Sequence, residues 1–300
     1  MTQRIGFIGI GMMGHGMVKN LLAKGFGVTI KANRNRANLT DLLAAGAKEA
    51  KTNAECANAS DIVFTCVTGS PQVEDIVYGA DGLLGAARAG LIVVDCSTAE
   101  PHSTTRIRND LAAKGVKLVD APLARTPKEA EEGKLNCMVG ADAADFKTVE
   151  PVLKAFCENI FHVGAPGSGH VLKLVNNMMA MTFAAAIAEG FAVGAKAGLD
   201  LNRLYDVISV GGVNCGIFQM MAAKTLQAGD VTGFKFGISN AQKDLRYYTH
   251  LAESLPVSSF IGEATHQSFI AAVNAGFGDK LIASLFEAQE KLNDVKIVPR

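Results

Sequence analysis

The 300-residue sequence contains no tryptophan and only four tyrosines, and its charges cancel, with 29 acidic and 29 basic residues. It also lacks a long run of one charge sign, which argues against a nucleic-acid surface or an acidic tail. We therefore expect neither nucleic acid nor a membrane as a partner. A small neutral or anionic ligand suits this charge balance better.

Cysteine and histidine are both sparse, with six of each, and neither residue forms a recognisable motif. No two cysteines have the C-x-x-C spacing of zinc ribbons and redox sites, so we expect buried free thiols in a reducing compartment. The histidines are isolated from one another. His15 and His170 lie beside glycines, but neither has the neighbouring partners of a catalytic triad or a metal site. We predict no catalytic metal.

A charged leader followed by an apolar core is also absent before the first predicted strand, and we expect a cytoplasmic protein. Residues 178–195 form an almost continuous apolar stretch of about the minimum length that spans a membrane. Thr182 and Glu189 interrupt this stretch, and alanine and glycine make up much of it. These features favour a central helix surrounded by other helices rather than a membrane span.

Glycine, by contrast, is abundant and forms the most informative motif, at the start of the chain. Gly9, Gly11 and Gly14 have the G-x-G-x-x-G spacing directly after an apolar run, and a helical pattern follows them. In dinucleotide-binding folds the first glycine permits a tight turn, the second lets the backbone approach a pyrophosphate, and the third lets the helix pack close to the strand. The motif predicts a dinucleotide site whose anion faces a helix N-terminus.

The two halves of the chain differ in pattern. In the first half, β-type runs alternate with helical segments, which predicts an α/β fold with a doubly wound parallel sheet of the Rossmann type. The second half has long alanine, leucine and methionine patterns, which predict an all-α domain joined to the first by a long helix. We predict a dinucleotide-binding domain at residues 1–164 and a helical substrate and oligomerisation domain at residues 165–300. The predicted strands are 4–8, 28–31, 62–67, 91–95, 117–120, 136–139 and 160–163, and the predicted helices of the first domain include 14–23, 39–45, 104–113 and 143–155.

The end of the second predicted strand indicates which dinucleotide binds. In such folds this position carries an acidic residue for the 2′-hydroxyl of NAD, or basic residues for the 2′-phosphate of NADP. Here no carboxylate occurs before Asp41, whereas Lys31, Arg34 and Arg36 are basic. Because arginine offers planar donors that match a phosphate, we predict NADP. The alternative is that these arginines are solvated at the start of a helix and that NAD binds without the acid.

A lysine near the start of the long predicted helix is the main catalytic candidate. Lys173 and Asn177 are four residues apart, so they share one face of that helix. A lysine that faces a cleft can have a lowered pKa and exchange a proton near neutral pH, while an asparagine can hold the same substrate oxygen. The alternative is a lysine whose charged end reaches solvent from a helix end, with a capping asparagine beside it.

Five motifs in order resemble those of the β-hydroxyacid dehydrogenase family. They are Gly9-x-Gly11-x-Met13-Gly14, Asp95-Cys96-Ser97-Thr98, Asp120-Ala121-Pro122, the glycine-flanked Lys173-x-x-Asn176-Asn177, and Lys243-Asp244. The resemblance covers essentially the whole chain. The family includes 3-hydroxyisobutyrate dehydrogenases, tartronate semialdehyde reductases and sulfolactaldehyde reductases.

The resemblance implies roles for particular residues. It implies that Lys173 is the general acid/base at the substrate hydroxyl or carbonyl and that Asn177 helps to position that oxygen. It also implies that Ser97 lies near the nicotinamide and the substrate, and that Lys243 closes the cleft from the second domain. The residues expected at the substrate are Ser97, Thr98, Arg125, Thr126 and Lys243, and those expected at the cofactor are Gly9, Gly11, Met12, Met13, Gly14, Asn33, Arg34, Arg36, Val67, Thr68 and Lys243.

One turn departs from the family pattern. After Asp120-Ala121-Pro122 the family usually has a Val-Ser-Gly-Gly turn, whose backbone N–H groups bind the substrate carboxylate, but this chain has Leu-Ala-Arg-Thr. Arg125 and Thr126 would add a cation and a hydroxyl, and a Gly-Arg-Thr version of the turn is a feature of the sulfolactaldehyde reductases. The alternative is that Arg125 points to solvent or pairs with Glu129 or Glu131.

These patterns predict an NADP-preferring oxidoreductase that transfers a hydride between a nicotinamide and a short anionic semialdehyde or its β-hydroxyacid. A reductase of 3-sulfolactaldehyde, which is a sulfonate, is the sharpest alternative. Imine reductases share the fold but generally lack the lysine, so Lys173 argues against that activity. An alternative of another class is a non-catalytic dinucleotide-binding scaffold or sensor, which needs the glycines but not Lys173, Asn177 or Lys243. The apolar helical half and the resemblance also imply a homodimer or homotetramer.

Overall fold

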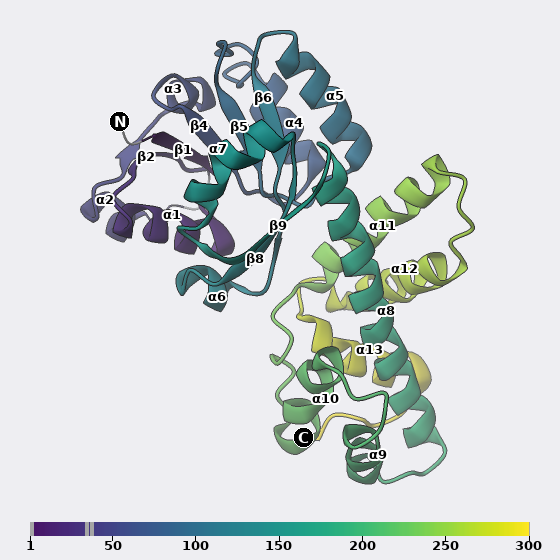
Figure 1. Cartoon of the computed structure of the whole chain (residues 1–300). Coiled ribbons are helices and arrows are strands. Elements are labelled where there is room, and N and C mark those ends of the chain that lie inside the picture. Colours follow the sequence, from purple (N-terminus) through teal and green to yellow (C-terminus); the bar gives the residue numbers. More distant parts are fainter. Residues whose placement is uncertain (1–2, 34–35, 37–38, 300) are drawn as a thin grey trace. The chain divides into compact units, whose positions relative to one another are not determined.

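The structure is a computed structural model that describes residues 3–33, 36 and 39–299. Its contacts divide the chain into two compact units, Met1–Lys173 and Leu174–Arg300. Figure 1 shows the strands together with helices in the first unit, and helices in the second. The division falls inside one long helix, later in the chain than the junction predicted between residues 164 and 165. That junction stays a prediction.

A single sheet organises the first unit. Within the described residues its nine strands are β1 (Arg4–Ile8), β2 (Gly27–Lys31), β3 (Lys48–Glu49), β4 (Ile62–Thr65), β5 (Ile92–Asp95), β6 (Lys117–Asp120), β7 (Leu123–Ala124), β8 (Leu135–Gly140) and β9 (Cys157–Gly164). Their order is β3-β2-β1-β4-β5-β6-β8-β7, and β9 pairs with β8 outside this path. Strands β1 to β6 pair in parallel, as predicted. Strand β8 then pairs antiparallel with β6 and β7 and parallel with β9.

The helices of the first unit begin close to their predicted bounds. They are α1 (Met12–Ala23), α2 (Thr40–Ala44), α3 (Asn53–Asn58), α4 (Ser70–Tyr78), α5 (Pro101–Ala112), α6 (Pro127–Glu131) and α7 (Ala143–Leu153). Helix α5 begins at Pro101 rather than at Thr104, because proline suits the first position of a helix, where its missing N–H costs nothing. Helices α3, α4 and α6 are additional to the segments named from the sequence.

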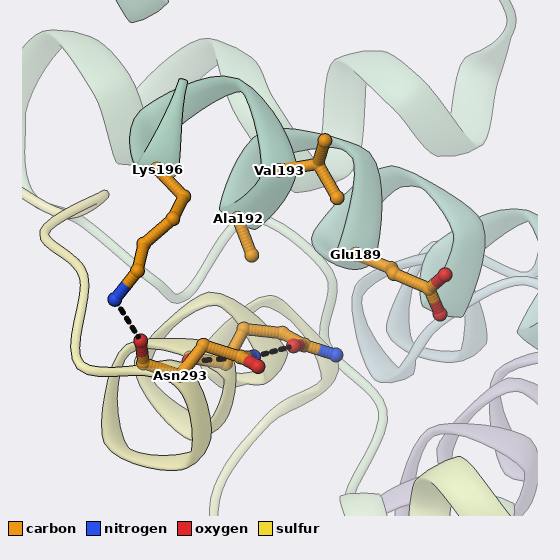
Figure 2. Close-up of a pocket in the computed structure, with 6 residues that line it drawn as sticks. Glu189, Ala192, Val193, Lys196 and Asn293 are labelled. Atoms are coloured by element: carbon orange, nitrogen blue, oxygen red, sulfur yellow. Dashed lines mark hydrogen bonds between the residues drawn. The ribbon is translucent and has the colours of Figure 1, made fainter. Parts of the chain in front are cut away.

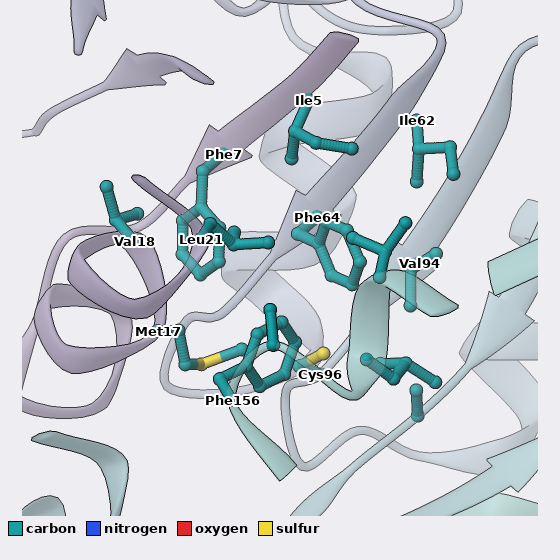
Figure 3. Close-up of a cluster of buried hydrophobic side chains, with 14 of the residues drawn as sticks. Ile5, Phe7, Met17, Val18, Leu21, Ile62, Phe64, Val94, Cys96 and Phe156 are labelled. Carbon is teal, nitrogen blue, oxygen red and sulfur yellow. The ribbon is translucent and has the colours of Figure 1, made fainter. Parts of the chain in front are cut away.

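Alternation along the central strands shows that both faces of the sheet are covered. In β4, Ile62 and Phe64 belong to one buried cluster and Val63 belongs to another. Successive side chains of a strand point to opposite faces, so these clusters are the cores on the two sides of the sheet. Figure 3 shows the first cluster, in which Met17 and Leu21 of α1 pack with the strand residues. The predicted doubly wound fold is confirmed.

The second unit is helical, which confirms the all-α prediction. Its helices are the later part of α8 (Ser168–Lys196), α9 (Leu201–Ser209), α10 (Gly216–Ala228), α11 (Ile238–Ser254), α12 (Phe260–Ala272) and α13 (Leu285–Asn293), with a π-helical turn at Val273–Phe277 and a 3-10 turn at Ile282–Ser284. Phe191 packs against Phe218 and Phe286 in the core, with ring centroids 6.3 and 5.5 Å away. Between described residues after 173, the isolated β pairing is one bridge, from Gly237 to Leu281.

Helix α8 contains the apolar stretch that resembles a membrane span. Its 29 residues are long and apolar enough to cross a membrane by length and composition alone. Its residues Met181, Ala184 and Phe191 are buried in the core of the second unit. Because a buried core helix has the same composition, length and hydropathy give only a weak indication of a membrane span here.

Candidate active site

The glycine-rich turn joins β1 to α1 in a conformation that side chains would block. Gly9 has a φ of +106°, and a Cβ atom there would lie 2.3 Å from the carbonyl oxygen of Cys66. A Cβ atom at Gly14 would lie 2.1 Å from the carbonyl oxygen of Gly9. The turn and the close approach of helix to strand therefore require glycine at both positions, for the reasons that the motif predicts.

The N-terminus of α1 is open to a ligand. Gly11 is the N-cap, it provides no side-chain cap, and no atom lies within 4 Å of the place where its Cβ would be. Met12 is exposed and Met13 is half-buried. The first N–H groups of a helix have no partner within the helix, and the helix dipole favours an anion beside them. These residues fit the pyrophosphate of a dinucleotide.

The residues after β2 include a paired arginine. Asn33 and Arg36 are exposed, and Arg34 lies outside the described residues. The Arg36 guanidinium contacts both carboxylate oxygens of Glu49 on β3, with Nη1 2.8 Å from Oε1 and Nη2 2.9 Å from Oε2. The hydrogen bond from Arg36 lowers the pKa of Glu49, and the charges of Arg36 and Lys31 lower it further. Arg36, which is predicted to bind the cofactor, is thus already paired with a carboxylate.

His15, whose neighbours in sequence give it no partner, bridges two carboxylates. Its Nδ1 lies 2.5 Å from Oε1 of Glu131 on α6, and its Nε2 lies 2.8 Å from Oδ2 of Asp41 on α2. Lys19 also pairs with Glu131, at 3.0 Å. Burial acts to lower the pKa of His15, but the hydrogen bonds and charges of the two carboxylates raise it overall. The imidazole therefore ties α1 to both α2 and α6.

The carboxyl ends of β4 and β5 meet around Ser97. Its hydroxyl accepts a hydrogen bond from the N–H of Val67 at 3.0 Å, and its own N–H donates to Oδ1 of Asp95 at 3.0 Å. The same carboxylate oxygen accepts from the hydroxyl of Thr65 at 2.8 Å. Ser97 and Asp95 are both buried. The structure thus brings together Val67, predicted at the cofactor, and Ser97, predicted at the substrate. They lie at the carboxyl ends of the parallel strands, where ligands bind in open α/β folds. Thr68 and Thr98, the next residues in the chain, are the other two predicted here.

Asp120, at the end of β6, caps the start of α8. It is only 1% exposed, its Oδ1 accepts from the N–H of Gly167 at 2.6 Å, and its Oδ2 accepts from the N–H of His170 at 2.9 Å. A Cβ atom at Gly140 would lie 2.5 Å from this carboxylate, and one at Gly169 would lie 2.8 Å from it. The carboxylate therefore anchors the start of the helix that carries the predicted catalytic residues to the end of β6.

His170 is fully buried in the first turn of α8. Its Nδ1 lies 2.7 Å from the hydroxyl of Thr104 on α5. Its Nε2 lies 3.7 Å from Oδ2 of Asp95 and makes no hydrogen bond. The ring thus packs between α5 and the end of β5. Because Thr104 is 66 residues away in the chain, no local sequence pattern predicts this contact.

Arg125 is held by its neighbours in the turn after β7. It has a φ of +80°, a left-handed conformation that residues other than glycine rarely adopt. Its Nη1 donates to the carbonyl oxygen of Lys134 at 2.6 Å and to the carboxylate of Glu158 on β9. Its acidic partner is thus neither of the two glutamates considered from the sequence. An anion that binds Arg125 has to compete with Glu158.

Thr126 is the N-cap of α6. Its hydroxyl accepts from the N–H of Lys128 at 3.3 Å and donates to Oε2 of Glu129 at 2.5 Å. The Glu129 carboxylate in turn accepts from the N–H of Thr126 at 2.9 Å, which completes a capping box. The hydrogen bond from the Thr126 hydroxyl lowers the pKa of Glu129. Thr126 thus caps helix α6, in addition to its predicted role in binding the substrate.

Lys173 and Asn177 both lie on α8, and their spacing puts them on one face, as predicted. Lys173 is half-buried and Asn177 is buried. Within the second unit, Nδ2 of Asn177 donates to Oδ2 of Asp244 on α11 at 2.6 Å. Nζ of Lys243 lies 2.8 Å from Oδ1 of Asp244 and 4.9 Å from the centre of the Tyr247 ring. The structure thus groups two predicted residues, Asn177 and Lys243, around one carboxylate.

Asp95, Asp120, Asp244 and Glu49 bind the residues of the candidate site, and none of these carboxylates has a role predicted from the sequence. Asp95 and Asp120 both end buried strands, which is a signal that sequence can give, because a charge there is costly unless it is paired. Asp244 follows Lys243 directly and faces a buried helix side. Glu49 has no such signal, because it belongs to a two-residue strand.

The cysteines are all free thiols, and four of the six are buried. Burial raises the pKa of Cys56 to about 11 and that of Cys66 to about 12. Such thiols are protonated at neutral pH and react slowly. Among the described residues, no group of three or more histidines, cysteines or acids could hold a metal ion.

Two family models match the chain one after the other. Residues 4–164 match the NAD-binding domain of 6-phosphogluconate dehydrogenase, and residues 167–288 match the NAD-binding domain of NADP-dependent 3-hydroxyisobutyrate dehydrogenase. Among curated proteins, 2-(hydroxymethyl)glutarate dehydrogenase of Eubacterium barkeri is 33% identical over 295 residues, which cover 98% of this chain and 97% of that protein.

Solved structures agree with these matches. The 3-hydroxyisobutyrate dehydrogenase of Mycobacterium tuberculosis with L-serine has a TM-score of 0.85 at 26% identity, covering 96% of this chain and 99% of that one. Psf3 in complex with NADP+ and 2-OPP has a TM-score of 0.81 at 26% identity, covering 94% of this chain and 99% of that one. Both neighbours extend over the sheet unit and the helical unit.

Proposed function

Because the chain belongs to the β-hydroxyacid dehydrogenase family, whose members are NAD(P)-dependent oxidoreductases, we propose that it interconverts a short anionic semialdehyde and its β-hydroxyacid. NADP is the preferred cofactor and NAD the alternative. The open N-terminus of α1 would hold the pyrophosphate, and the basic segment after β2 would hold the 2′-phosphate.

Lys173 manages the proton in this reaction. In the reducing direction, its ammonium donates a proton to the substrate oxygen as the carbonyl bond opens, and Asn177 holds the same oxygen. In the oxidising direction, the neutral amine takes the proton from the hydroxyl group. The nicotinamide, when bound, supplies or accepts the hydride at the substrate carbon. Ser97, Thr98 and Lys243 orient the acid group of the substrate.

The observation that carries this proposal is the anchoring of α8 on either side of Lys173 along the chain. Asp120 binds two backbone N–H groups at the start of the helix, and Asp244 binds the side chain of Asn177 one turn after the lysine. Preorganised donors accelerate a reaction because they need not rearrange as charge develops on the substrate. These two contacts support a lysine held in place by its helix, rather than one whose charged end reaches freely into solvent.

Replacement of Lys173 by alanine tests this role. We expect turnover to fall by about 10²- to 10⁴-fold, because that is the usual contribution of a positioned acid or base. The dissociation constant of NADPH, followed by nucleotide fluorescence, should stay nearly unchanged. Lys154→Ala is the control, since Lys154 follows helix α7 and pairs with Glu150 at an exposed position. Substantial turnover in Lys173→Ala would exclude the proton-transfer role.

The substrate class follows from a panel of carboxylate and sulfonate semialdehydes, each tested with NADH and NADPH. We expect carboxylate semialdehydes to be favoured, because Arg125 is bound to Glu158 and Lys134. A preference for sulfolactaldehyde that is lost in Arg125→Gly would instead assign the sulfonate reaction. Glycine also accepts the left-handed backbone at this position, so the variant should fold. Tight NADPH binding without turnover on any substrate would favour a scaffold or sensor.

We also propose a homodimer or homotetramer formed through the second unit. On α8, Met179, Phe183 and Val193 are about half exposed or more, which is unusual for large apolar side chains. Val193 lines a pocket of about 400 Å³. Figure 2 shows its side chain on α8 between those of Glu189 and Lys196. Glu189 and Lys196 flank it, so an antiparallel copy of α8 would pair opposite charges across a two-fold axis.

Light scattering coupled to size exclusion tests the assembly. The wild-type mass should be twice or four times that of one chain, and Val193→Glu should reduce it. A monomeric wild-type protein at micromolar concentration would rule the assembly out.

Two further proposals concern organisation and location. We propose that residues 1–164 bind the dinucleotide and that residues 165–300 form the substrate and oligomerisation domain, and the ranges of the two family matches support this division. Limited proteolysis should then cleave near residue 165.

We also propose a cytoplasmic location, which cell fractionation tests directly.

A further inference from the structure

The pairing of Arg36 with Glu49 lies beside the expected ribose end of the cofactor site. Both carboxylate oxygens are engaged, at 2.8 and 2.9 Å, so the guanidinium presents its fork to this one partner. Arg36 is 61% exposed and Glu49 is 28% exposed, so a ligand can reach the arginine from solvent. The contact is therefore reversible and weak, as exposed ion pairs are.

The position of Glu49 gives this contact a meaning. Strand β3 adds to the outer side of β2, and Glu49 lies opposite Ile30, one residue before the end of β2. The carboxyl end of β2 is where dinucleotide folds distinguish a ribose hydroxyl from a phosphate. Strand β2 itself has no acid there, but Glu49 supplies a negative charge from the neighbouring strand. Lys31 adds a second cation beside it.

We propose that Glu49 sets the cofactor preference by competing with the 2′-phosphate of NADP for the guanidinium of Arg36. This inference rests on the proposed NADP preference and names the residue that limits it. The segment after β2 thus holds NADP less tightly than its arginines alone would allow.

The competition follows from the geometry of the groups. A carboxylate and a phosphate both accept two parallel N–H bonds from a guanidinium, and one fork cannot give the same two donors to both. A 2′-phosphate that reaches Arg36 must therefore displace Glu49 or lie beside its negative charge. A ribose with a free 2′-hydroxyl carries no such charge, so its binding leaves the pair intact.

The test measures binding of two cofactor fragments, 2′,5′-ADP and 5′-AMP, to the full-length protein by titration calorimetry at fixed ionic strength. In Glu49→Gln we expect 2′,5′-ADP to bind about two- to fivefold more tightly, which corresponds to the value of an exposed ion pair. Binding of 5′-AMP should not change. In Arg36→Gln, 2′,5′-ADP should bind more weakly and 5′-AMP should again be unaffected.

The matched control is Asp61→Asn. Asp61 also pairs with an arginine through both oxygens, to Arg4 at 2.7 and 3.2 Å, but it lies at the amino end of the central strand β4, away from the carboxyl ends of the strands. This variant should change binding of neither fragment. The full chain is used throughout, and thermal unfolding of each variant confirms that it is folded.

Two results would overturn the inference. The first is a Glu49→Gln protein that binds 2′,5′-ADP no more tightly than the wild type. The second is a Glu49→Gln protein that binds 5′-AMP more weakly than the wild type while its binding of 2′,5′-ADP is unchanged. That result would mean that Glu49 accepts a hydrogen bond from a ribose hydroxyl. Both readouts are independent of turnover, so a failure of the proposed reaction leaves them intact. If the wild type binds neither fragment, the proposed function fails with the cofactor site itself.

Discussion

Two buried aspartates, one in each unit, hold their stretches of helix α8 in different ways. Asp120 accepts from two backbone N–H groups and is enclosed by glycines whose missing Cβ atoms make room for it. Asp244 contacts two side chains instead, the amide of Asn177 and the ammonium of Lys243. Backbone donors are present whatever the sequence, whereas side-chain donors are specific to it. We infer that Asp120 serves the fold and Asp244 serves the chemistry.

Asp120→Ala should give the largest effect on stability. The buried N–H group of His170 and the half-buried one of Gly167 would lose their acceptor, and an unsatisfied buried group costs about 1–3 kcal/mol. We therefore expect the free energy of unfolding to fall by about 3 kcal/mol or more, measured by urea denaturation. Asp120→Asn keeps one acceptor and should lose less. Unchanged stability in the alanine variant would remove the contrast between the two aspartates.

Gly169→Ala examines the same anchor from the other side. The new Cβ atom would lie 2.5 Å from the carbonyl oxygen of Met138 and 2.8 Å from the Asp120 carboxylate, so the helix start has to shift. Such overpacking costs about 1–3 kcal/mol. Gly190→Ala, later on α8, is the control, because nothing lies within 4 Å of its Cβ position. The control should be neutral or slightly stabilising, since alanine is the better helix former.

Asp244→Asn should reverse the pattern seen at Asp120. Asparagine keeps the shape and an oxygen for Asn177, but it removes the charge that faces Lys243. We expect kcat/KM to fall by about 10- to 100-fold, because a hydrogen bond to a charged group contributes about 1.5–3 kcal/mol. The free energy of unfolding should change less than in Asp120→Ala. Separate measurement of kcat and KM shows whether the oxygen-holding or the substrate-orienting role is lost. A purely structural role would lower stability and leave both constants alone.

The pair of contacts made by His15 should give the smallest effect, and one that depends on pH. Its folded pKa is raised, so the contacts contribute stability fully below the ordinary histidine pKa of about 6.5. This contribution is lost as the pH rises through the higher folded pKa. We expect wild type to lose about 1 kcal/mol or less relative to His15→Gln over this window, because the carboxylates are partly solvated. Identical pH profiles of the two proteins would show that the bridge adds nothing.

The sequence predicted what depends on local patterns. The glycine turn, the parallel sheet, the helical second half and the shared face of Lys173 and Asn177 follow from spacings of a few residues. The family resemblance is confirmed over the whole chain. The roles of the predicted site residues stay predictions.

What the sequence did not predict depends on contacts between distant segments. Glu131, which contacts His15, is 116 residues away from it, and Glu158 is 33 residues beyond Arg125. These partners meet only because the strand order brings their elements together. Two-residue strands such as β3 carry too little pattern to be recognised, so the pairing of Glu49 with Arg36 appears only in the folded chain.

Because helix α8 is continuous from Ser168 to Lys196, the number of residues between Lys173 and Asn177 decides whether their side chains lie on the same face. Each residue turns the helix by about 100° and advances it by 1.5 Å. Inserting or deleting a single residue between Lys173 and Asn177 would rotate one side chain away from the other while leaving the composition of the helix almost unchanged. At positions 174–176, between the two groups, the number of residues therefore matters more than their identity. We expect natural or designed variants to carry substitutions there but no insertions or deletions.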